Sequence, residues 1–239
     1  MVGAVVALRQ APIAQLFPTL LTAAFLWTIS SWGYYAVVEV LGLERGYDQA
    51  PFTFVTYYLA WSLIAMFAFR RALARELTTV SIANHAIALF PILILIGLFS
   101  TLVLPLFPDI SVFRAPPNPP EFMFSSAWYY LPKSTDILFQ QVMIAAIVRT
   151  ADHLKIRIVY IAFLLATMFG GIHLTLALDG FTSLYVARFT AAAVIFGFCA
   201  PFLYLRVKHG FRWAYTAHFT FYLLDAVLTH LLLAVPASS

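Results

Sequence analysis

Long apolar stretches alternate with short polar connections along the chain, and this alternation predicts its secondary structure. A helix needs about 20 mostly apolar residues to cross the hydrocarbon core of a membrane. Seven stretches approach or exceed this length, at residues 14–38, 52–70, 84–104, 134–149, 157–178, 184–206 and 213–235. The fourth is the shortest, because Pro132 suits a first helical turn but not a helix interior. The pattern predicts an all-α polytopic bundle of about seven transmembrane helices.

A proline-rich connection divides these predicted helices into two groups. Six prolines fall between residues 105 and 120 of the connection 105–133, and they exclude a continuous helix there. The aromatic residues 128–130 precede the fourth stretch and are typical of a membrane interface. We therefore expect a three-helix N-terminal part (1–110), a proline-rich outer loop (111–133) and a four-helix C-terminal core (134–239).

Composition supports a membrane protein and excludes several other classes. The chain is 63% hydrophobic and 10% charged, whereas soluble domains are about 45–50% apolar and about 25% charged. Its one cysteine, Cys199, excludes a disulfide within the chain and a cysteine metal cluster. The net charge of +4 comes from short basic clusters between apolar stretches, which does not indicate nucleic-acid binding. We therefore expect the lipid bilayer to surround most of the protein.

The basic residues predict how the helices are oriented. Three alternate connections and the N-terminal tail hold ten of the fourteen, namely Arg9, Arg70, Arg71, Arg75, Arg149, Lys155, Arg157, Arg206, Lys208 and Arg212. The opposite connections hold only Arg45, Arg114 and Lys133, and Arg188 lies within a predicted span. Cytoplasmic loops carry the excess of basic residues. We expect seven spans with the N-terminus in the cytoplasm and the C-terminus opposite, in a bacterial inner membrane.

Polar residues within the predicted spans are the candidate site, because such residues usually face a bundle interior or cavity. They gather in the C-terminal part, as Asp136, Gln140 and Gln141 on the fourth span, His173 on the fifth, and His218 and Asp225 on the seventh. Asp136 and Gln140 are four residues apart and share a helix face. His218 and Asp225 are seven apart, so this carboxylate is a candidate orienting partner for the histidine.

These polar groups allow two interpretations. Histidines from separate helices, with a carboxylate, make a candidate metal site, and catalytic zinc takes three protein ligands and one water. Alternatively, each polar group forms an interhelical hydrogen bond, which stabilises membrane bundles by about 0.6 to 2 kcal/mol. At 1.5 Å per residue, His173 lies about 24 Å from the inner end of its span and His218 roughly 9 Å from that of its own. Upright helices would hold the two histidines too far apart to share a metal ion.

The order of these residues resembles the family of CAAX prenyl proteases and bacteriocin-processing proteins (CPBP). That family has Glu-Glu-x-x-x-Arg on one helix, Phe-x-x-x-His on the next, and His-x-x-x-Asn or Asp on the last. Phe169 and His173 match the second motif, and His218 begins the third, with Tyr222 in its final place. Gln140 and Gln141 stand where the glutamates are expected, and Ala145 where the arginine is expected. The resemblance covers residues 134 to about 230 and implies a CPBP-like four-helix core.

The resemblance implies a degenerate active site at Gln140, Gln141, His173 and His218. In the family, the first glutamate, at the position of Gln140, activates the water that attacks the peptide bond, and histidines hold a metal or the oxyanion. An amide accepts and donates hydrogen bonds but is not a base, and loss of a general base costs about 10²–10⁴-fold in rate. Asp136 and Asp225 are the candidate substitute acids.

Three functions follow from these observations. The first is a non-catalytic binding or structural subunit of a larger membrane complex of the respiratory, photosynthetic or transport kind, without a cofactor. The second is an active, divergent intramembrane metalloprotease, with zinc held by His173 and His218. The third is a small-molecule transporter or binder that uses the polar centre. The missing carboxylates favour the first, which predicts a membrane-protein partner.

Overall fold

Every regular element in the described part of the chain is a helix. The structure is a computed structural model, and it describes residues 12–44, 46–79, 82–108, 127–178 and 181–232. Most of the proline-rich outer loop predicted at 111–133 lies outside these ranges. The long helices are α1 (Pro12–Leu41), α3 (Pro51–Ala68), α5 (Ile82–Leu98), α6 (Tyr130–His153), α7 (Ile158–Leu174), α8 (Ser183–Arg206) and α9 (Gly210–Leu232).

Short helices extend or connect the long ones. They are α2 (Gly46–Gln49), α4 (Arg70–Thr79), the π-helical η1 (Phe99–Val103), and the 3-10 turns η2 (Leu104–Leu106), η4 (Ala127–Tyr129) and η5 (Thr175–Ala177). The segments η1 and η2 continue α5 without a break, and η5 continues α7. Three connections between the predicted spans contain helical segments that the hydropathy pattern did not predict, namely α2, α4 and η4.

A long helix occupies each of the seven predicted spans, and four helical segments are long and apolar enough to cross a membrane. These four are Pro51–Ala68, Ala83–Leu106, Ile158–Ala177 and Ser183–Arg206. The fourth predicted span is longer than expected, since α6 covers 24 residues and begins at Tyr130. Its proline, Pro132, lies in the first helical turn, where no intrahelical N–H bond is lost.

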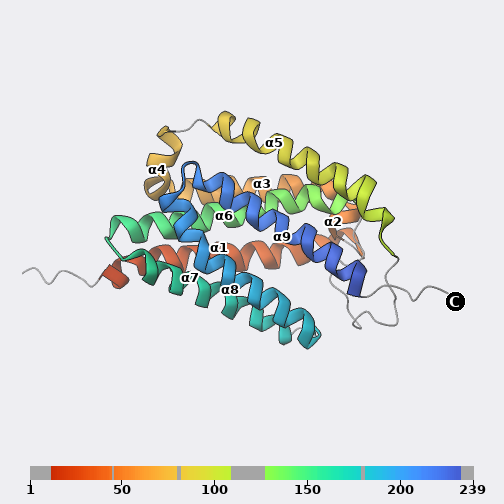
Figure 1. The fold of residues 1–239 in the computed structure, drawn as a ribbon. Coiled ribbons are helices and arrows are strands. Elements are labelled where there is room, and N and C mark those ends of the chain that lie inside the picture. The colour runs from red at the N-terminus through yellow and green to blue at the C-terminus, as the bar shows by residue number, and fades with distance from the viewer. Residues whose placement is uncertain (1–11, 45, 80–81, 109–126, 179–180, 233–239) are drawn as a thin grey trace, which may run out of the picture.

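Helix α6 runs through the centre of the bundle (Figure 1), and this position explains its low hydropathy. A continuous run from Gln141 to Val148 is buried on every side of the helix. A helix that is buried all round needs neighbours on all faces, and α6 packs against α3, α1 and α9. Because protein and not lipid surrounds α6, it can carry polar side chains that a lipid-facing helix would not tolerate.

The core continues across the predicted division between the N-terminal part and the C-terminal core. Tyr58 of α3 lies 6.4 Å, between ring centroids, from Phe139 of α6. Trp27 of α1 lies 6.1 Å from Phe169 of α7 in an edge-on arrangement. One cluster of buried apolar residues contains members of both parts, so the first helices support the C-terminal ones directly.

Helices α7 and α8 form a tightly packed hairpin. At Gly197 of α8, a side chain would meet the backbone of Leu165 and Ala166 at 2.8 Å. Glycine therefore permits backbone contact between the two helices, as small residues do in membrane bundles. Gly210 at the start of α9 is equally constrained, because a Cβ there would lie 1.9 Å from the carbonyl oxygen of Leu203.

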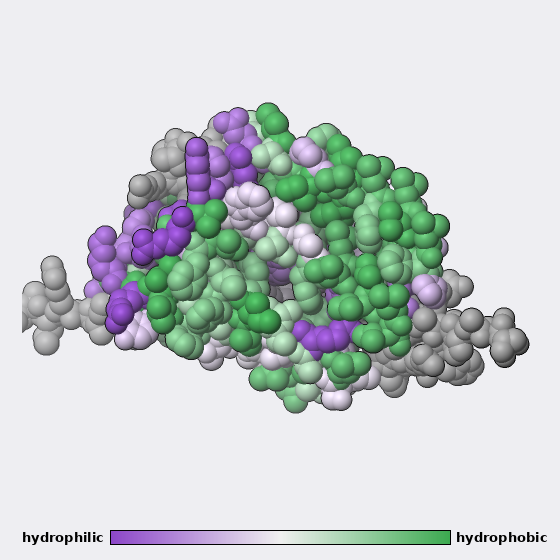
Figure 2. All heavy atoms as spheres, in the orientation of Figure 1, coloured by the Kyte–Doolittle hydropathy of each residue, from purple (hydrophilic) through white to green (hydrophobic). Residues whose placement is uncertain are grey.

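The surface has an apolar body and a polar end. Figure 2 shows hydrophobic side chains over most of the visible face and hydrophilic ones gathered at the end near α4 and the start of α9. Exposed large apolar residues include Phe90, Leu95, Phe163 and Ile195. Such an extended apolar surface is typical of contact with lipid and indicates a membrane protein.

Candidate functional site

The polar side chains of α6 begin with an ion pair near its N-terminal end. Lys133 Nζ lies 2.7 Å from one carboxylate oxygen of Asp136, and Gln140 Nε2 donates to the other at 2.9 Å. Asp136 and Gln140 therefore share a helix face, as expected, and a hydrogen bond joins their side chains across one helical turn. Both oxygens of this candidate acid have partners on its own helix.

Gln141 occupies a different environment from Gln140. Its side chain is 0% exposed, and its amide nitrogen lies 2.9 Å from Nδ1 of His218 on α9. The hydroxyl of Tyr204 on α8 contacts its side-chain oxygen and also donates to its backbone carbonyl at 3.2 Å. A single buried amide thus links α6, α8 and α9.

These contacts assign the proton of His218. The hydroxyl of Tyr204 shares its one proton between the backbone and side-chain oxygens of Gln141, and the amide nitrogen faces the histidine. That nitrogen only donates, and Nδ1 of His218 therefore accepts. A neutral His218 then carries its proton on Nε2, next to the cavity that the ring lines.

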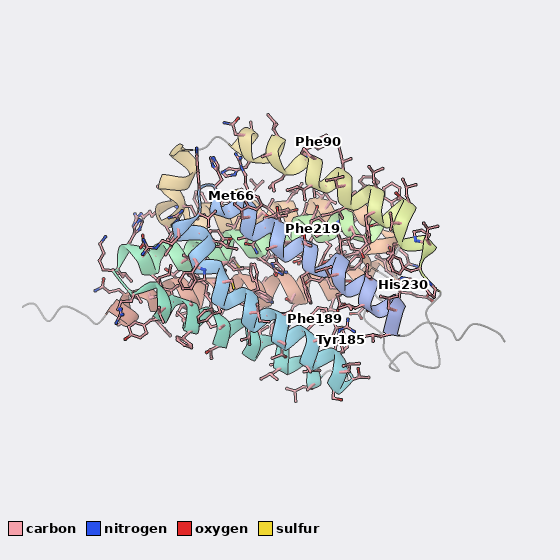
Figure 3. All side chains as sticks on the ribbon, in the orientation of Figure 1. Met66, Phe90, Tyr185, Phe189, Phe219 and His230 are labelled. Carbon is pink, nitrogen blue, oxygen red and sulfur yellow. The ribbon has the colours of Figure 1, made fainter. Side chains whose placement is uncertain are left out.

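In His173, near the end of α7, the donor and acceptor roles of the two ring nitrogens are the reverse of those in His218. Nδ1 of His173 lies 2.7 Å from the carbonyl oxygen of Phe169, which can only accept, so Nδ1 is the donor. In a neutral ring the other nitrogen is left as an acceptor. The ring stacks on Phe189 at 6.2 Å between centroids, and Phe189 stacks on Tyr185 at 4.3 Å. Figure 3 labels these two aromatic residues on α8.

Two cavities meet at this polar centre. A largely apolar cavity of about 410 Å³ is lined by His173, His218 and Tyr222 together with aromatic residues of α7, α8 and α9. A second cavity, of about 470 Å³, is lined by Asp136 and Gln140 together with His173 and Tyr222. The helices are tilted and their starts are staggered (Figure 1). His173 and His218 therefore line one cavity, in place of the wide separation expected for upright helices.

Asp225 is part of another interaction. Its buried carboxylate contacts the guanidinium of Arg188 on α8, and the same guanidinium donates to Thr229 at 3.3 Å. His218 is hydrogen-bonded to Gln141, so the described structure does not contain the expected pair between His218 and Asp225. The reason is that Arg188, a full cation within the bundle, is the stronger partner for a buried carboxylate.

The site offers Nε2 of His218 as a hydrogen-bond donor and Nε2 of His173 as an acceptor. It also contains the amide of Gln141 and the ion pair between Lys133 and Asp136. Within the described ranges, no group of three or more His, Cys, Asp or Glu side chains is arranged to hold a metal ion. The carboxylate of Asp136 is grouped with Lys133, and that of Asp225 with Arg188. Chemically, the arrangement can bind and orient a polar group, and His218 and His173 are its hydrogen-bonding groups.

Three residues of this centre were missed by the sequence reasoning. Lys133, which the sequence predicts in a loop, lies 4.3 Å from the centre of the Tyr222 ring and forms an ion pair with Asp136. Tyr222, treated as a mismatch to a motif, stacks on His218 at 5.8 Å. Tyr204 forms the link to Gln141. The spacing of three between Lys133 and Asp136 was an available signal, whereas the contacts of both tyrosines depend on tertiary packing.

Comparison with known proteins identifies no relative. No protein-family model matches the chain, and no curated protein or solved structure matches it.

Proposed function

We propose that this chain is a non-catalytic membrane protein with a CPBP-protease-like bundle, and that it acts as a binding or structural subunit of a larger membrane complex. The environment of Gln141 is the observation that carries this proposal. Gln140 and Gln141 stand where the resemblance places two glutamates, the first of which activates water. The amide of Gln140 is bonded to Asp136, and both ends of the Gln141 amide have partners on neighbouring helices. An amide cannot accept the proton of an attacking water.

The remaining candidate acids also support a non-catalytic function. A substitute general base must lie within hydrogen-bond reach of the water it activates. The oxygens of Asp136 face Lys133 and Gln140, and Asp225 lies beside Arg188. These contacts make each carboxylate part of a structural ion pair. The polar centre then holds the helices of the bundle in a fixed arrangement, on which a partner can dock.

The proposal is tested by the size of the assembly that contains the chain. Chemical cross-linking in intact membranes, followed by extraction in mild detergent and native mass spectrometry, should give a defined complex with a constant partner and stoichiometry. Membranes that have not been cross-linked are extracted in a harsher detergent as a control, which should release the chain alone. A monomer from both the cross-linked membranes and the mild extract would contradict the proposal.

The two adjoining cavities favour small-molecule binding as a second candidate. Each has a volume within the range of about 300–1,000 Å³ that is usual for ligand pockets. Ala192 lines the apolar cavity, whereas its exposed neighbour Ala191 does not. Under this candidate, native mass spectrometry should detect a retained small molecule that Ala192→Leu displaces and Ala191→Leu does not. Equal retention in both variants would rule out this cavity as the binding site.

A further inference from the structure

A basic cavity of about 600 Å³ lies at the opposite end of α6 from Lys133, between the α6–α7 turn and the α8–α9 turn. Its lining includes six cationic or titratable basic side chains, namely His85, Arg149, Lys155, Arg157, Arg206 and His209. One acid, Asp152, is also part of the lining. Clefts with an excess of one charge concentrate ions of the opposite sign, so this cavity selects for anions.

Two helix N-termini add to this positive potential. The lining includes Ile158, the first residue of α7, and Gly210, the first residue of α9. Both helices are long, with 17 and 23 residues. The N-terminus of a helix carries a partial positive charge and N–H groups without an intrahelical acceptor, which together favour phosphate and similar anions.

Each turn that borders the cavity holds a basic residue in the left-handed backbone conformation. Lys155 and His209 both have φ of 60°. Glycine is the usual residue at such a position after a helix, because a side chain there is strained. The backbone bonds that end α6, from Lys155 N–H to Asp152 and from Ile156 N–H to Ala151, do not require a side chain. A lysine in this position thus places a cation at the cavity where a glycine would be less strained.

The wall of the cavity is fixed by contacts between helices. The guanidinium of Arg149, near the end of α6, donates to the carbonyl oxygen of Tyr204 on α8 at 3.1 Å. Arg212 of α9 donates to Nδ1 of His85 on α5 at 3.1 Å, beside the rim. These bonds join four helices around one opening. Arg149 and His85 are therefore held in place before any ligand binds, which reduces the ordering cost of binding.

We propose that this cavity binds a phosphate-bearing anion, with the headgroup of an anionic phospholipid or a free phosphate compound as its source. Basic pockets between transmembrane helices on the cytoplasmic side are suited to such headgroups, and arginine is suited to phosphate through paired N–H donors. The alternative is that these residues are only solvated loop cations of the kind that orient any membrane protein. The proposal concerns a separate site and does not depend on the function proposed for the polar centre.

The test compares two double variants of the full chain in detergent. Lys155→Gly with Arg157→Gln removes two charges from the cavity, and the glycine relaxes the strained turn, so the fold is retained. Arg71→Gln with Lys208→Gln removes two exposed charges that do not line the cavity. Binding of short-chain phosphatidylglycerol, of short-chain phosphatidylcholine and of inorganic phosphate is measured for each by native mass spectrometry and by the shift in melting temperature.

Phosphatidylglycerol should bind more tightly than phosphatidylcholine, and the cavity variant should weaken it by about tenfold or more while the control variant leaves it nearly unchanged. The same pattern with inorganic phosphate alone would support the site and identify a free phosphate compound as its source. Equal weakening in both variants would show that only the net charge matters and would overturn the proposal. The absence of binding by phosphatidylglycerol and by phosphate would also overturn it.

Discussion

The two neighbouring glutamines show how one residue type has different functions at adjacent positions of a helix. Gln140 is half-buried and bonds to Asp136 on its own helix. Gln141 is fully buried and bonds to His218 and Tyr204 on two other helices. Because successive residues on a helix differ in direction by about 100°, the pair serves one local and one interhelical contact.

We predict that Gln141→Ala is much more destabilising than Gln140→Ala. The first leaves His218 and Tyr204 without their shared partner in a buried site, which should cost about 1–3 kcal/mol of unfolding free energy. The second removes a local contact and should cost less than about 1 kcal/mol. Unfolding by denaturant in mixed micelles measures both. Equal losses would show that the interhelical link does not stabilise the bundle.

The buried ion pair between α8 and α9 gives a second prediction. Asp225→Leu leaves Arg188 as an uncompensated charge, Arg188→Met leaves Asp225 as one, and each should cost about 3–5 kcal/mol. The double variant Arg188→Met with Asp225→Leu removes both charges and should recover most of that loss. A double-mutant cycle on thermal unfolding in detergent provides the comparison. If the double variant is as unstable as the sum of the two single ones, the two side chains do not interact.

At the scale of elements, the close packing of α7 against α8 depends on a glycine. The central helix α6 depends on protein neighbours that surround it. Gly197 permits α8 to approach the backbone of α7. Helix α6 is enclosed by α1, α3 and α9, and its polar groups therefore find partners within the bundle. The apolar helices thus form a shell that protects one polar helix from lipid.

Gly197→Ala should separate α7 from α8 and cost about 1–3 kcal/mol, the usual effect of overpacking. Gly171 on α7 is the matched control, because a Cβ there would meet no heavy atom within 4 Å. Gly171→Ala should be neutral or stabilising by up to about 1 kcal/mol, since alanine is the better helix former. Melting temperatures of the purified variants measure the difference. A stable Gly197→Ala variant would mean that the two backbones are not in contact.

The sequence predicted the positions of the long helices well and their contacts less well. The long apolar stretches located all seven, and the shared face of Asp136 and Gln140 followed from their spacing. The pairing of Asp225 was not predicted, because spacing along one helix indicates only His218. Arg188, the stronger partner, reaches the carboxylate through the packing of α8 against α9. The ends of α6 were placed too far inward, because its polar ends are stabilised by tertiary contacts rather than by hydropathy.

At the scale of the whole molecule, the basic turns and the polar centre lie at different depths of one bundle. The α6–α7 and α8–α9 turns border one cavity at the basic end. Lys133 and the aromatic residues Tyr47 and Tyr129 lie together at the other side of the polar centre. The predicted orientation places the basic turns in the cytoplasm, because cytoplasmic loops carry the excess of basic residues.

Site-specific labelling tests that orientation. In a Cys199→Ala background, single cysteines at Lys208 and at Glu44, both exposed, should differ in their access to a membrane-impermeant thiol reagent. With the predicted orientation, intact cells label the Glu44→Cys variant and leave the Lys208→Cys variant unlabelled until the membrane is permeabilised. Labelling of both residues from outside, or of Lys208→Cys alone, would contradict the predicted orientation.

The most direct test of a non-catalytic polar centre is the metal content of the purified chain, measured together with peptidase activity. The chain and a His173→Ala, His218→Ala double variant are loaded with zinc, passed over a desalting column and analysed by elemental mass spectrometry. Because Gln140 and Gln141 carry amides and the candidate acids Asp136 and Asp225 are paired with Lys133 and Arg188, we predict equal, substoichiometric zinc in both proteins and no cleavage of membrane peptides by either. One zinc ion per chain in the wild type, lost together with peptidase activity in the double variant, would contradict the account.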